Sequence, residues 1–252
     1  MLDTGWMVVA ALAVFGLAGW VKGLVGLGLP TVSMALLALF MPAGEAAALL
    51  LLPSLITNFV QMRPFAGLPA LLARLGGMQV GIVLGTLGGM ALWGTVGSLP
   101  GAHKALGLAL VTYALWGLWG PQWLVPVQHQ RWLGLVIGAV TGVITALTGV
   151  FVVPAVAFLQ ALGLARTTLM QAMGLCFTVS TLALGLGMWC FGAGSAKTGL
   201  GHGLLVSAFM LIPALAGMCW GERLREKLSP SFFKKVLMLS LLLLGVYLGF
   251  KS

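Results

Sequence analysis

A lysine stands near the end of an apolar run close to the start of the chain. The run begins at Trp6, and Lys22 comes one residue before a glycine-rich stretch, KGLVGLGLPT. If this run crosses a membrane, a charged side chain within it is costly and usually indicates function. Snorkelling of the long side chain toward the membrane surface is the alternative. As a fixed cation, Lys22 would attract an anion and repel a metal ion.

The glycine-rich stretch predicts a break in the helix that contains this lysine. Glycines at 23, 26 and 28 leave backbone N–H groups uncovered by side chains. Pro30 suits the first turn of a new helix. The start of that helix offers free amide donors and the positive end of a helix dipole, which suits an oxyanion. Packing between membrane helices is the alternative role for Gly23, Gly26 and Gly28.

A similar pattern recurs in the second half of the chain, in TALTGVFVVP. Thr145 and Thr148 precede Gly149, and Pro154 follows it. The threonine hydroxyls would supply part of the hydrogen bonding that glycine amides supply in the first half. Two broken helices in matching positions are the sequence feature that best indicates the binding site of a carrier.

Two further apolar runs carry polar side chains that share one helical face. The run over 46–62 has Ser54, Thr57, Asn58 and Gln61, and the run over 167–191 has Gln171, Thr178 and Thr181. Hydrogen bonding between helices explains such residues in many membrane proteins. The alternative is a polar lining beside the two breaks, and we expect Asn58, Gln61, Gln171 and Thr178 to belong to it.

Acidic residues are almost absent from the apolar runs. The chain has only four, at Asp3, Glu45, Glu222 and Glu226, and none lies in the middle of a run. Cation carriers and proton pumps usually need a buried carboxylate. The charge pattern therefore favours an anion as the substrate.

Catalysis has no support in the residue pattern. No Ser-His-Asp set, histidine cluster or nucleotide-binding loop is visible, so we expect no enzyme and no cofactor. Cys176, Cys190 and Cys219 stand at no metal-ligand spacing. No basic face outside the membrane is available to dock a nucleic acid.

The composition is that of a multi-pass protein of the inner membrane. Of 252 residues, 60% are hydrophobic and 7% charged, against about 25% charged in soluble domains. The first run follows Asp3 without a basic residue before it, so we expect a first span rather than a cleavable signal peptide. We therefore expect the lipid bilayer to be the main partner. A homodimer is an alternative that the sequence neither favours nor excludes.

About ten helical segments are expected in this all-α fold. They cover 6–25, 29–41, 46–62, 75–93, 103–119, 132–149, 151–162, 167–191, 200–220 and 232–250. The second and seventh segments would be only about 18–20 Å long as helices. This is shorter than the ~30 Å hydrocarbon core, so we expect half-membrane, broken or re-entrant helices there.

The segments divide into two similar halves. Residues 1–120 form the first five-helix repeat, 121–131 a cytoplasmic linker and 132–252 the second repeat. Duplication of an odd number of helices inverts the second copy in the membrane. One set of loops holds Arg63, Arg74, Arg131, Arg166, Arg223, Arg225, Lys227, Lys234 and Lys235, whereas the other holds Lys104, Lys197 and Lys251. The positive-inside rule then places the first set in the cytoplasm and both termini in the periplasm.

The same stretches resemble the sulfite exporter TauE/SafE family of membrane carriers. The resemblance rests on KGLVGLGLPTVSMALL and LLLPSLITNFVQ in the first half and on GVITALTGVFVVPAVAFLQALGLARTTLMQAMGLCFTVSTLAL in the second. It covers nearly the whole chain. The sequence departs from many members at Leu27, Leu29 and Val150, where they are richer in glycine. The family's glycine-proline repeats map onto Gly23, Gly26, Gly28, Pro30, Gly149 and Pro154, and its common glutamine maps onto Gln171.

This resemblance implies transport of sulfite, sulfonates such as sulfoacetate, or related small anions. We therefore expect a secondary transporter that works by alternating access. An anion channel of the same architecture and a transition-metal permease that uses methionine and cysteine are the alternatives. A membrane scaffold and a membrane enzyme have no motif in their favour.

Overall fold

A computed structural model describes residues 5–120, 124–192, 194–225 and 230–250, with side chains at 5–120, 124–192, 205–225 and 235–250. Within these ranges the protein is all-helical, with ten α-helices, two short 3-10 helices and no strand. The α-helices are α1 Gly5–Val25, α2 Leu29–Leu37, α3 Ala43–Gln61, α4 Leu68–Trp93, α5 Ala102–Trp119, α6 Gln130–Thr148, α7 Ala155–Ala161, α8 Arg166–Phe191, α9 Gly194–Leu224 and α10 Pro230–Phe250. The expected all-α fold is thus confirmed.

Six stretches of helix are long and apolar enough to cross a membrane. They are Gly5–Val25, Ala43–Gln61, Phe65–Trp93, Val127–Thr148, Arg166–Phe191 and Leu205–Leu224. A seventh apolar stretch, Lys235–Phe250, is shorter. The length and composition of the described helices therefore support a multi-pass membrane protein, with fewer full-length spans than the ten segments expected.

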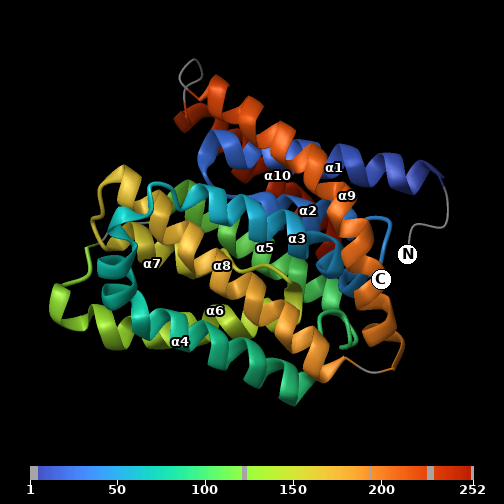
Figure 1. Ribbon diagram of the computed structural model, residues 1–252, viewed down its shortest axis with the longest axis horizontal. Coiled ribbons are helices and arrows are strands. Elements are labelled where there is room, and N and C mark those ends of the chain that lie inside the picture. The colour runs from blue at the N-terminus through green and yellow to red at the C-terminus, as the bar shows by residue number, and fades with distance from the viewer. Residues whose placement is uncertain (1–4, 121–123, 193, 226–229, 251–252) are drawn as a thin grey trace.

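Long helices pair across the two halves of the chain. α1 packs along α9, α4 packs along α6, and α5 packs along α10. α3 and α8 contact each other between the first two pairs, with α3 also against α9 and α8 against α4 (Figure 1). Each long-range pair joins one helix of residues 1–120 to one of residues 132–252.

Small residues bring the paired helices into close contact. A side chain at Gly19 of α1 would overlap the backbone of Ala214 in α9. In the same way, a side chain at Gly81 of α4 would overlap the backbone of Leu135 in α6. Close approach through small residues is how membrane helices gain van der Waals contact when the surrounding solvent is itself apolar. Much of the chain's glycine is therefore explained by packing.

Each short helix returns along the helix that precedes it. The ring of Phe40, just after α2, lies 5.7 Å from that of Trp6 at the start of α1. After α7, the carbonyl of Leu162 accepts a hydrogen bond of 3.3 Å from Arg74, which also donates to Gln130 at the start of α6. The stretches 26–41 and 149–162 thus each run back to the level at which α1 and α6 begin.

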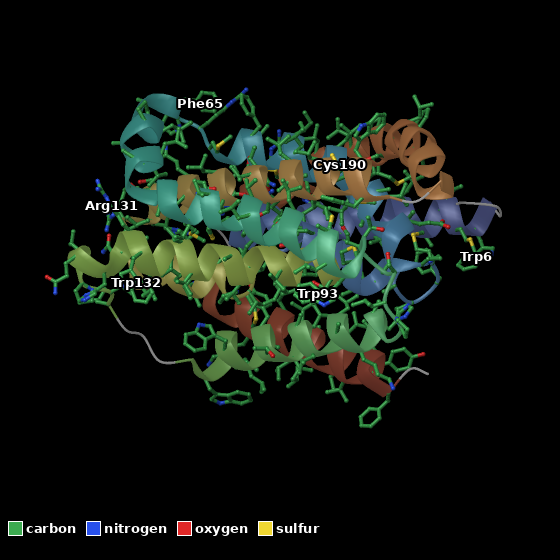
Figure 2. All side chains as sticks on the ribbon, turned by 90° about the horizontal axis from the view of Figure 1, so that it is seen from below. Trp6, Phe65, Trp93, Arg131, Trp132 and Cys190 are labelled. Atoms are coloured by element: carbon green, nitrogen blue, oxygen red, sulfur yellow. The ribbon has the colours of Figure 1, made fainter. Side chains whose placement is uncertain are left out.

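Several arginines gather at one end of the molecule, which we call the arginine end. α1 and α3 finish there and α4, α6 and α8 begin there, as the contacts of Gly26, Gln61 and Met170 and of Arg74 and Gln130 require. Arg131 lies at this end in Figure 2, with Trp6 at the opposite end. The start of α1 and the end of α10 lie together at that opposite end (Figure 1). Lys227 and Lys251, which entered the charge count, lie outside the described residues, as do the side chains of Lys197 and Lys234.

A proline in α3 leaves a backbone carbonyl without its helical hydrogen bond, and a serine from the second half of the chain supplies that bond. Pro53 has no N–H, so the Leu49 carbonyl one turn earlier has no partner within the helix. Ser207 of α9 donates its hydroxyl to that carbonyl at 2.6 Å and accepts the N–H of Leu52 at 3.2 Å. This fixes the segment of α3 that leads into Thr57 and Asn58.

The outward faces of the helices are apolar (Figure 2). Large apolar side chains with more than half of their surface exposed include Leu84, Leu92, Leu108, Leu205, Phe209, Ile212 and Leu243. A soluble protein rarely exposes so much contiguous apolar surface. Lipid chains are the solvent that suits this surface.

Candidate functional site

The first predicted break separates α1 from α2. α1 ends at Val25, where the N–H of Gly26 donates to the carbonyl of Lys22 at 2.7 Å. Gly26 and Gly28 have φ angles of 81° and 113°, which side chains rarely tolerate. α2 then begins at Leu29 with Pro30 in its first turn. Because α1 continues to Val25, Gly23 lies inside the helix, packed against α9, and not in the break itself.

Lys22 is buried in the last turn of α1. Its side chain is 1% exposed, so it does not snorkel to the surface. The Nζ atom donates to Thr57 Oγ1 at 3.0 Å and to Asn58 Oδ1, both on α3. Among the described residues Lys22 forms no ion pair, so its hydrogen bonds are to neutral oxygens. A buried ammonium group without a carboxylate is an unusual arrangement, because burial of an uncompensated charge is unfavourable.

The acceptors of Lys22 are themselves held in place. Thr57 donates its hydroxyl to the carbonyl of Pro53 at 2.6 Å, which leaves its oxygen free to accept from Lys22. The amide nitrogen of Asn58 lies 3.5 Å from the hydroxyl oxygen of Thr181 on α8, and Thr181 donates to the carbonyl of Phe177. A chain of polar groups therefore links α1, α3 and α8, and with them both halves of the protein.

Gln61 closes the site on the side of the break. Its Nε2 donates to the carbonyl of Gly26 at 2.7 Å and to that of Met170 at 3.2 Å. Its Oε1 is buried and has no hydrogen-bond partner among the described residues. We call Lys22, Thr57, Asn58, Gln61 and Thr181 the lysine cluster. It combines one cation with amide and hydroxyl groups, which is chemistry that binds anions.

The second predicted break separates α6 from α7. Gly149, with φ of 70°, ends α6, and α7 starts after Pro154. The hydroxyl of Thr145 donates to the carbonyl of Thr141 at 2.8 Å. That of Thr148 donates to the carbonyl of Ile144 at 2.7 Å and accepts the N–H of Val150 at 3.1 Å. Both threonines therefore support their own helix end, and neither touches Lys22.

A methionine from the opposite half covers each break. A side chain at Gly26 would overlap the thioether end of Met170 from α8. A side chain at Gly149 would lie 2.9 Å from Cε of Met34 from α2. The two breaks thus share a positive-φ glycine and a flexible apolar cover.

In the comparison with protein families, the chain matches the model described as sulfite exporter TauE/SafE over residues 11–248. The chain belongs to the sulfite exporter TauE/SafE family. No curated protein and no solved structure matches the chain significantly. The family resemblance expected from the sequence is confirmed, and the protein is a membrane transporter; transporters of this family are not enzymes.

Two predicted site residues of this TauE/SafE transporter lie away from the lysine cluster. Gln171 donates through Nε2 to the carbonyls of Met62, at 3.4 Å, and Pro64, and so holds the turn that follows α3. Thr178 donates to the carbonyl of Gly174 within α8 at 2.8 Å. These contacts are ones that support helices and turns.

An arginine caps the end of α1 beside the cluster. Arg225, just after α9, donates through Nη2 to the carbonyl of Gly23 at 2.6 Å and through Nε to that of Leu24 at 3.2 Å. Partial burial lowers the pKa of Arg225, Glu222 raises it, and the nearby charge of Arg166 lowers it. The guanidinium stays charged, because arginine does not deprotonate in proteins.

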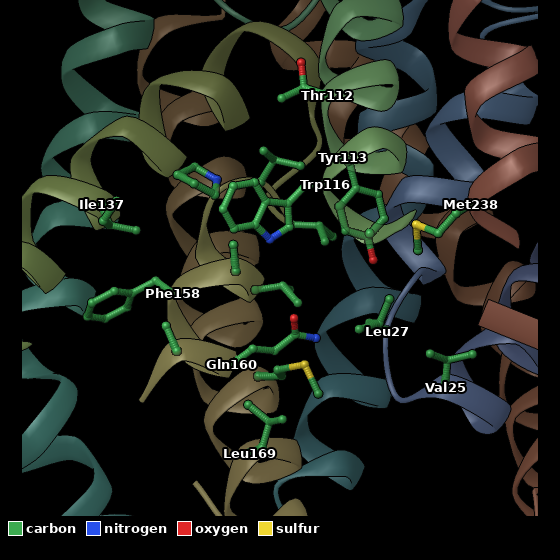
Figure 3. A pocket seen from close by; sticks show the side chains of 18 of the residues that line it. Val25, Leu27, Thr112, Tyr113, Trp116, Ile137, Phe158, Gln160, Leu169 and Met238 are labelled. Atoms are coloured by element: carbon green, nitrogen blue, oxygen red, sulfur yellow. The ribbon is translucent and has the colours of Figure 1, made fainter. Parts of the chain in front are cut away.

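A cavity of about 850 Å³ lies beside the break, between the two halves (Figure 3). Residues of both breaks line it, including Leu27 from the first and Pro154 from the second. The ring of Trp116 projects into it, and the hydroxyl of Tyr113 points toward its interior (Figure 3). Lys22 does not line this cavity, although Met170, which covers Gly26, does.

The structure brings together only part of the residue set expected from the sequence. Lys22 bonds to Asn58, and Gln61, one turn further along α3, bonds to the carbonyl of Gly26. Gly28 and Pro30 shape the start of α2. The residues of the second break and of α8, Thr145, Thr148, Gly149, Pro154, Gln171 and Thr178, lie outside this cluster. Thr57 and Thr181 were recognised as polar face residues but not as site residues. Met170 and Arg225 act through contacts far apart in sequence, for which the residue pattern holds no signal.

Proposed function

We propose that this transporter is a secondary carrier of a small sulfur-containing anion, with the lysine cluster as its binding site. The observation that carries the proposal is Lys22, 1% exposed and bonded only to neutral oxygens among the described residues. An unpaired buried cation gains most from an anionic ligand. Sulfite, or a small sulfonate such as sulfoacetate, suits the description of the matching family.

The groups around Lys22 suit an oxyanion. Thr57 and Asn58 accept from Lys22, and both can exchange partners when an anion arrives. A sulfite oxygen would then accept from Nζ and from the amide of Asn58. Because charge-assisted hydrogen bonds are shorter and stronger than neutral ones, this exchange is favourable.

Packing supports a two-fold relation between the two halves, and the opposite directions of α1, which ends at the arginine end, and α6, which begins there, favour an inverted one. If α1–α5 correspond to α6–α10, the pair α1–α9 corresponds to α6–α4, and α3–α9 corresponds to α8–α4. The pairs α5–α10 and α3–α8 each correspond to themselves. This is the pattern expected of a two-fold axis between repeats, and rocking of one repeat against the other is a common basis of alternating access.

We further propose that the two broken segments cross the membrane rather than re-enter it. Each returns to the level at which the preceding helix begins, as the contact of Phe40 with Trp6 supports. With the arginine end in the cytoplasm, as the positive-inside rule favours, both termini lie on the periplasmic side. Irregular backbone at this depth is tolerated because protein surrounds it.

The test is transport by the Lys22→Gln variant in proteoliposomes. We expect loss of one hydrogen-bonded charge to lower sulfite or sulfoacetate uptake about 10- to 100-fold, corresponding to roughly 1.5–3 kcal/mol. Lys104→Gln, which removes an exposed lysine of α5, is the matched control and should transport normally. Unchanged flux and affinity in Lys22→Gln would remove the lysine cluster from the mechanism.

The same proteoliposomes distinguish the carrier from two alternatives, an anion channel and a transition-metal permease. A carrier shows saturable counterflow, in which unlabelled anion inside the vesicle speeds entry of labelled anion, whereas a channel does not. A transition-metal permease would use methionine and cysteine, and Cys176 Sγ lies 3.8 Å from Met78 Sδ. The described residues contain no group of three or more His, Cys, Asp or Glu side chains that could hold a metal ion. Replacement of Cys176, Cys190 and Cys219 by serine should therefore leave anion transport intact.

A further inference from the structure

The cavity between the two broken segments does not suit the small anion that Lys22 attracts. Its volume of about 850 Å³ lies within the range of roughly 300–1,000 Å³ that holds drug-sized ligands. Its walls are mostly aliphatic and aromatic, from Leu133 and Ile137 of α6 to Phe158 of α7 and Met238 of α10. A hydrated anion would lose water against these apolar walls and find few hydrogen-bond donors there in exchange.

The rim of the cavity has different chemistry from its walls. Arg166, at the start of α8, is exposed, lines the cavity and has no hydrogen bond or ion pair among the described residues. Arg225 is near enough to affect Arg166 electrostatically. The site therefore joins an apolar interior to a cationic rim at the arginine end.

We propose that this cavity holds an acyl chain of an anionic phospholipid, with the lipid phosphate against Arg166. The occupant follows from three observations: apolar walls, an arginine at the rim without a hydrogen bond or ion pair among the described residues, and an apolar outer surface of the kind that suits lipid. Burial of an acyl chain against apolar walls is favourable because it removes apolar surface from water. The phosphate lies in the combined field of Arg166 and Arg225, and basic side chains at a membrane surface attract anionic lipids.

The bound chain would also affect the motion of the carrier. Leu24 and Leu27 of the first half and Val152 and Pro154 of the second half face the same cavity. A chain between them fills the space into which the halves would move when they approach one another. A bound lipid would therefore hinder the approach of the two halves. Its binding does not depend on the identity of the transported anion.

The experiment measures retained lipid by native mass spectrometry after release from nanodiscs of equal phosphatidylglycerol and phosphatidylcholine. We expect the wild-type protein to retain one phosphatidylglycerol in preference to phosphatidylcholine. Ala157→Phe fills the cavity from α7 and should lower this retention at least tenfold. Ala91→Phe, on the exposed face of α4, is the matched control and should retain lipid as the wild type does.

A second pair of variants tests the headgroup without altering the packed interior. Arg166→Gln should abolish the preference for phosphatidylglycerol, whereas Arg131→Gln, an exposed arginine of the same end, should keep it. Equal retention in Ala157→Phe and Ala91→Phe, or an unchanged preference in Arg166→Gln, would overturn the proposal. So would displacement of the lipid by inorganic phosphate or by 2-naphthalenesulfonate, which would assign the cavity to a free anion. Because no transport is measured, failure here is distinct from failure of the lysine cluster.

Discussion

The two broken segments share a backbone but differ in chemistry. In each, a helix ends at a glycine with positive φ, a methionine from the other half covers that glycine, and a proline precedes or begins a short helix. Lys22 and Thr145 stand at the same offset before Gly26 and Gly149. Yet Lys22 reaches across to α3, whereas Thr145 bonds to its own helix. The backbone pattern is common to both copies, and the charge is present in only one.

This difference shows which parts of the breaks are structural and which are chemical. Positive-φ glycines and helix-end hydroxyls stabilise the backbone of an interrupted helix and need no ligand to explain them. A buried lysine with neutral partners does not help the fold, because its desolvation is unfavourable. The buried charge that the fold does not explain is therefore on the side of the first break.

The largest expected effect comes from adding the charge to the second break. Thr145 is fully buried and its only described hydrogen bond is to Thr141. Thr145→Lys would place an ammonium group where the wild-type side chain bonds only to its own helix, so we expect destabilisation of roughly 3–5 kcal/mol, as for other unpaired buried charges. The yield of monodisperse protein in detergent and its apparent Tm measure this.

Thr145→Val is the matched control, because it keeps the shape and removes only the hydroxyl. We expect it to fold and to transport close to the wild-type rate. If Thr145→Lys folds with a wild-type Tm, the second break has acceptors equivalent to those of the first, and the two regions are chemically alike after all.

The next effect comes from cancelling the charge at the first break. Asn58→Asp places a carboxylate beside Lys22, and the resulting ion pair leaves no net positive charge for an anion. We expect sulfite flux to fall about 10- to 100-fold, equivalent to roughly 1.5–3 kcal/mol of lost binding. The fold should be unaffected or stabilised, because the lysine gains a charged partner.

Proteoliposome flux and apparent Tm, measured together, separate the two effects. Ser98→Asp adds a carboxylate to an exposed loop and controls for a general change in charge. Wild-type flux in Asn58→Asp would contradict the assignment of the anion to this cluster and remove the functional contrast between the breaks.

The sequence was sufficient to predict where the helices are interrupted, but not which distant residues contact the interruptions. The glycine and proline positions were sufficient to predict that helices end near 26 and 149, because the allowed backbone conformations of these residues are a local property. The polar face of Thr57, Asn58 and Gln61 followed from helical spacing in the same way. These predictions depend on residues close together in the chain.

What sequence reasoning missed depends on contacts between distant segments. Gly23 was expected in the break, yet the carbonyls of Gly23 and Leu24 bond to Arg225, and close packing on α9 requires the glycine. Ser207 pairs with the backbone freed by Pro53, and Met170 covers Gly26. No spacing rule in one sequence identifies such partners, because they are set by how helices pack in three dimensions.

The smallest expected effect tests whether the two breaks are alike in backbone. Gly26→Ala and Gly149→Ala each force a side chain into a left-handed conformation, at a cost of about 1–2 kcal/mol. The neighbouring atoms belong to the flexible ends of Met170 and Met34, which can move. Most of the loss of stability at both sites should therefore come from the left-handed backbone conformation and not from steric overlap. We expect similar falls in apparent Tm, roughly 2–4 °C per kcal/mol for a chain of this size.

The double variants Gly26→Ala/Met170→Ala and Gly149→Ala/Met34→Ala measure the steric share of each cost. Transport should fall more in Gly26→Ala, because the carbonyl of Gly26 accepts from Gln61, which belongs to the lysine cluster. A loss of stability confined to one glycine would mean that the two breaks differ in backbone as well as in charge. Equal stability losses with unequal transport losses would locate the difference between the copies in side-chain chemistry alone.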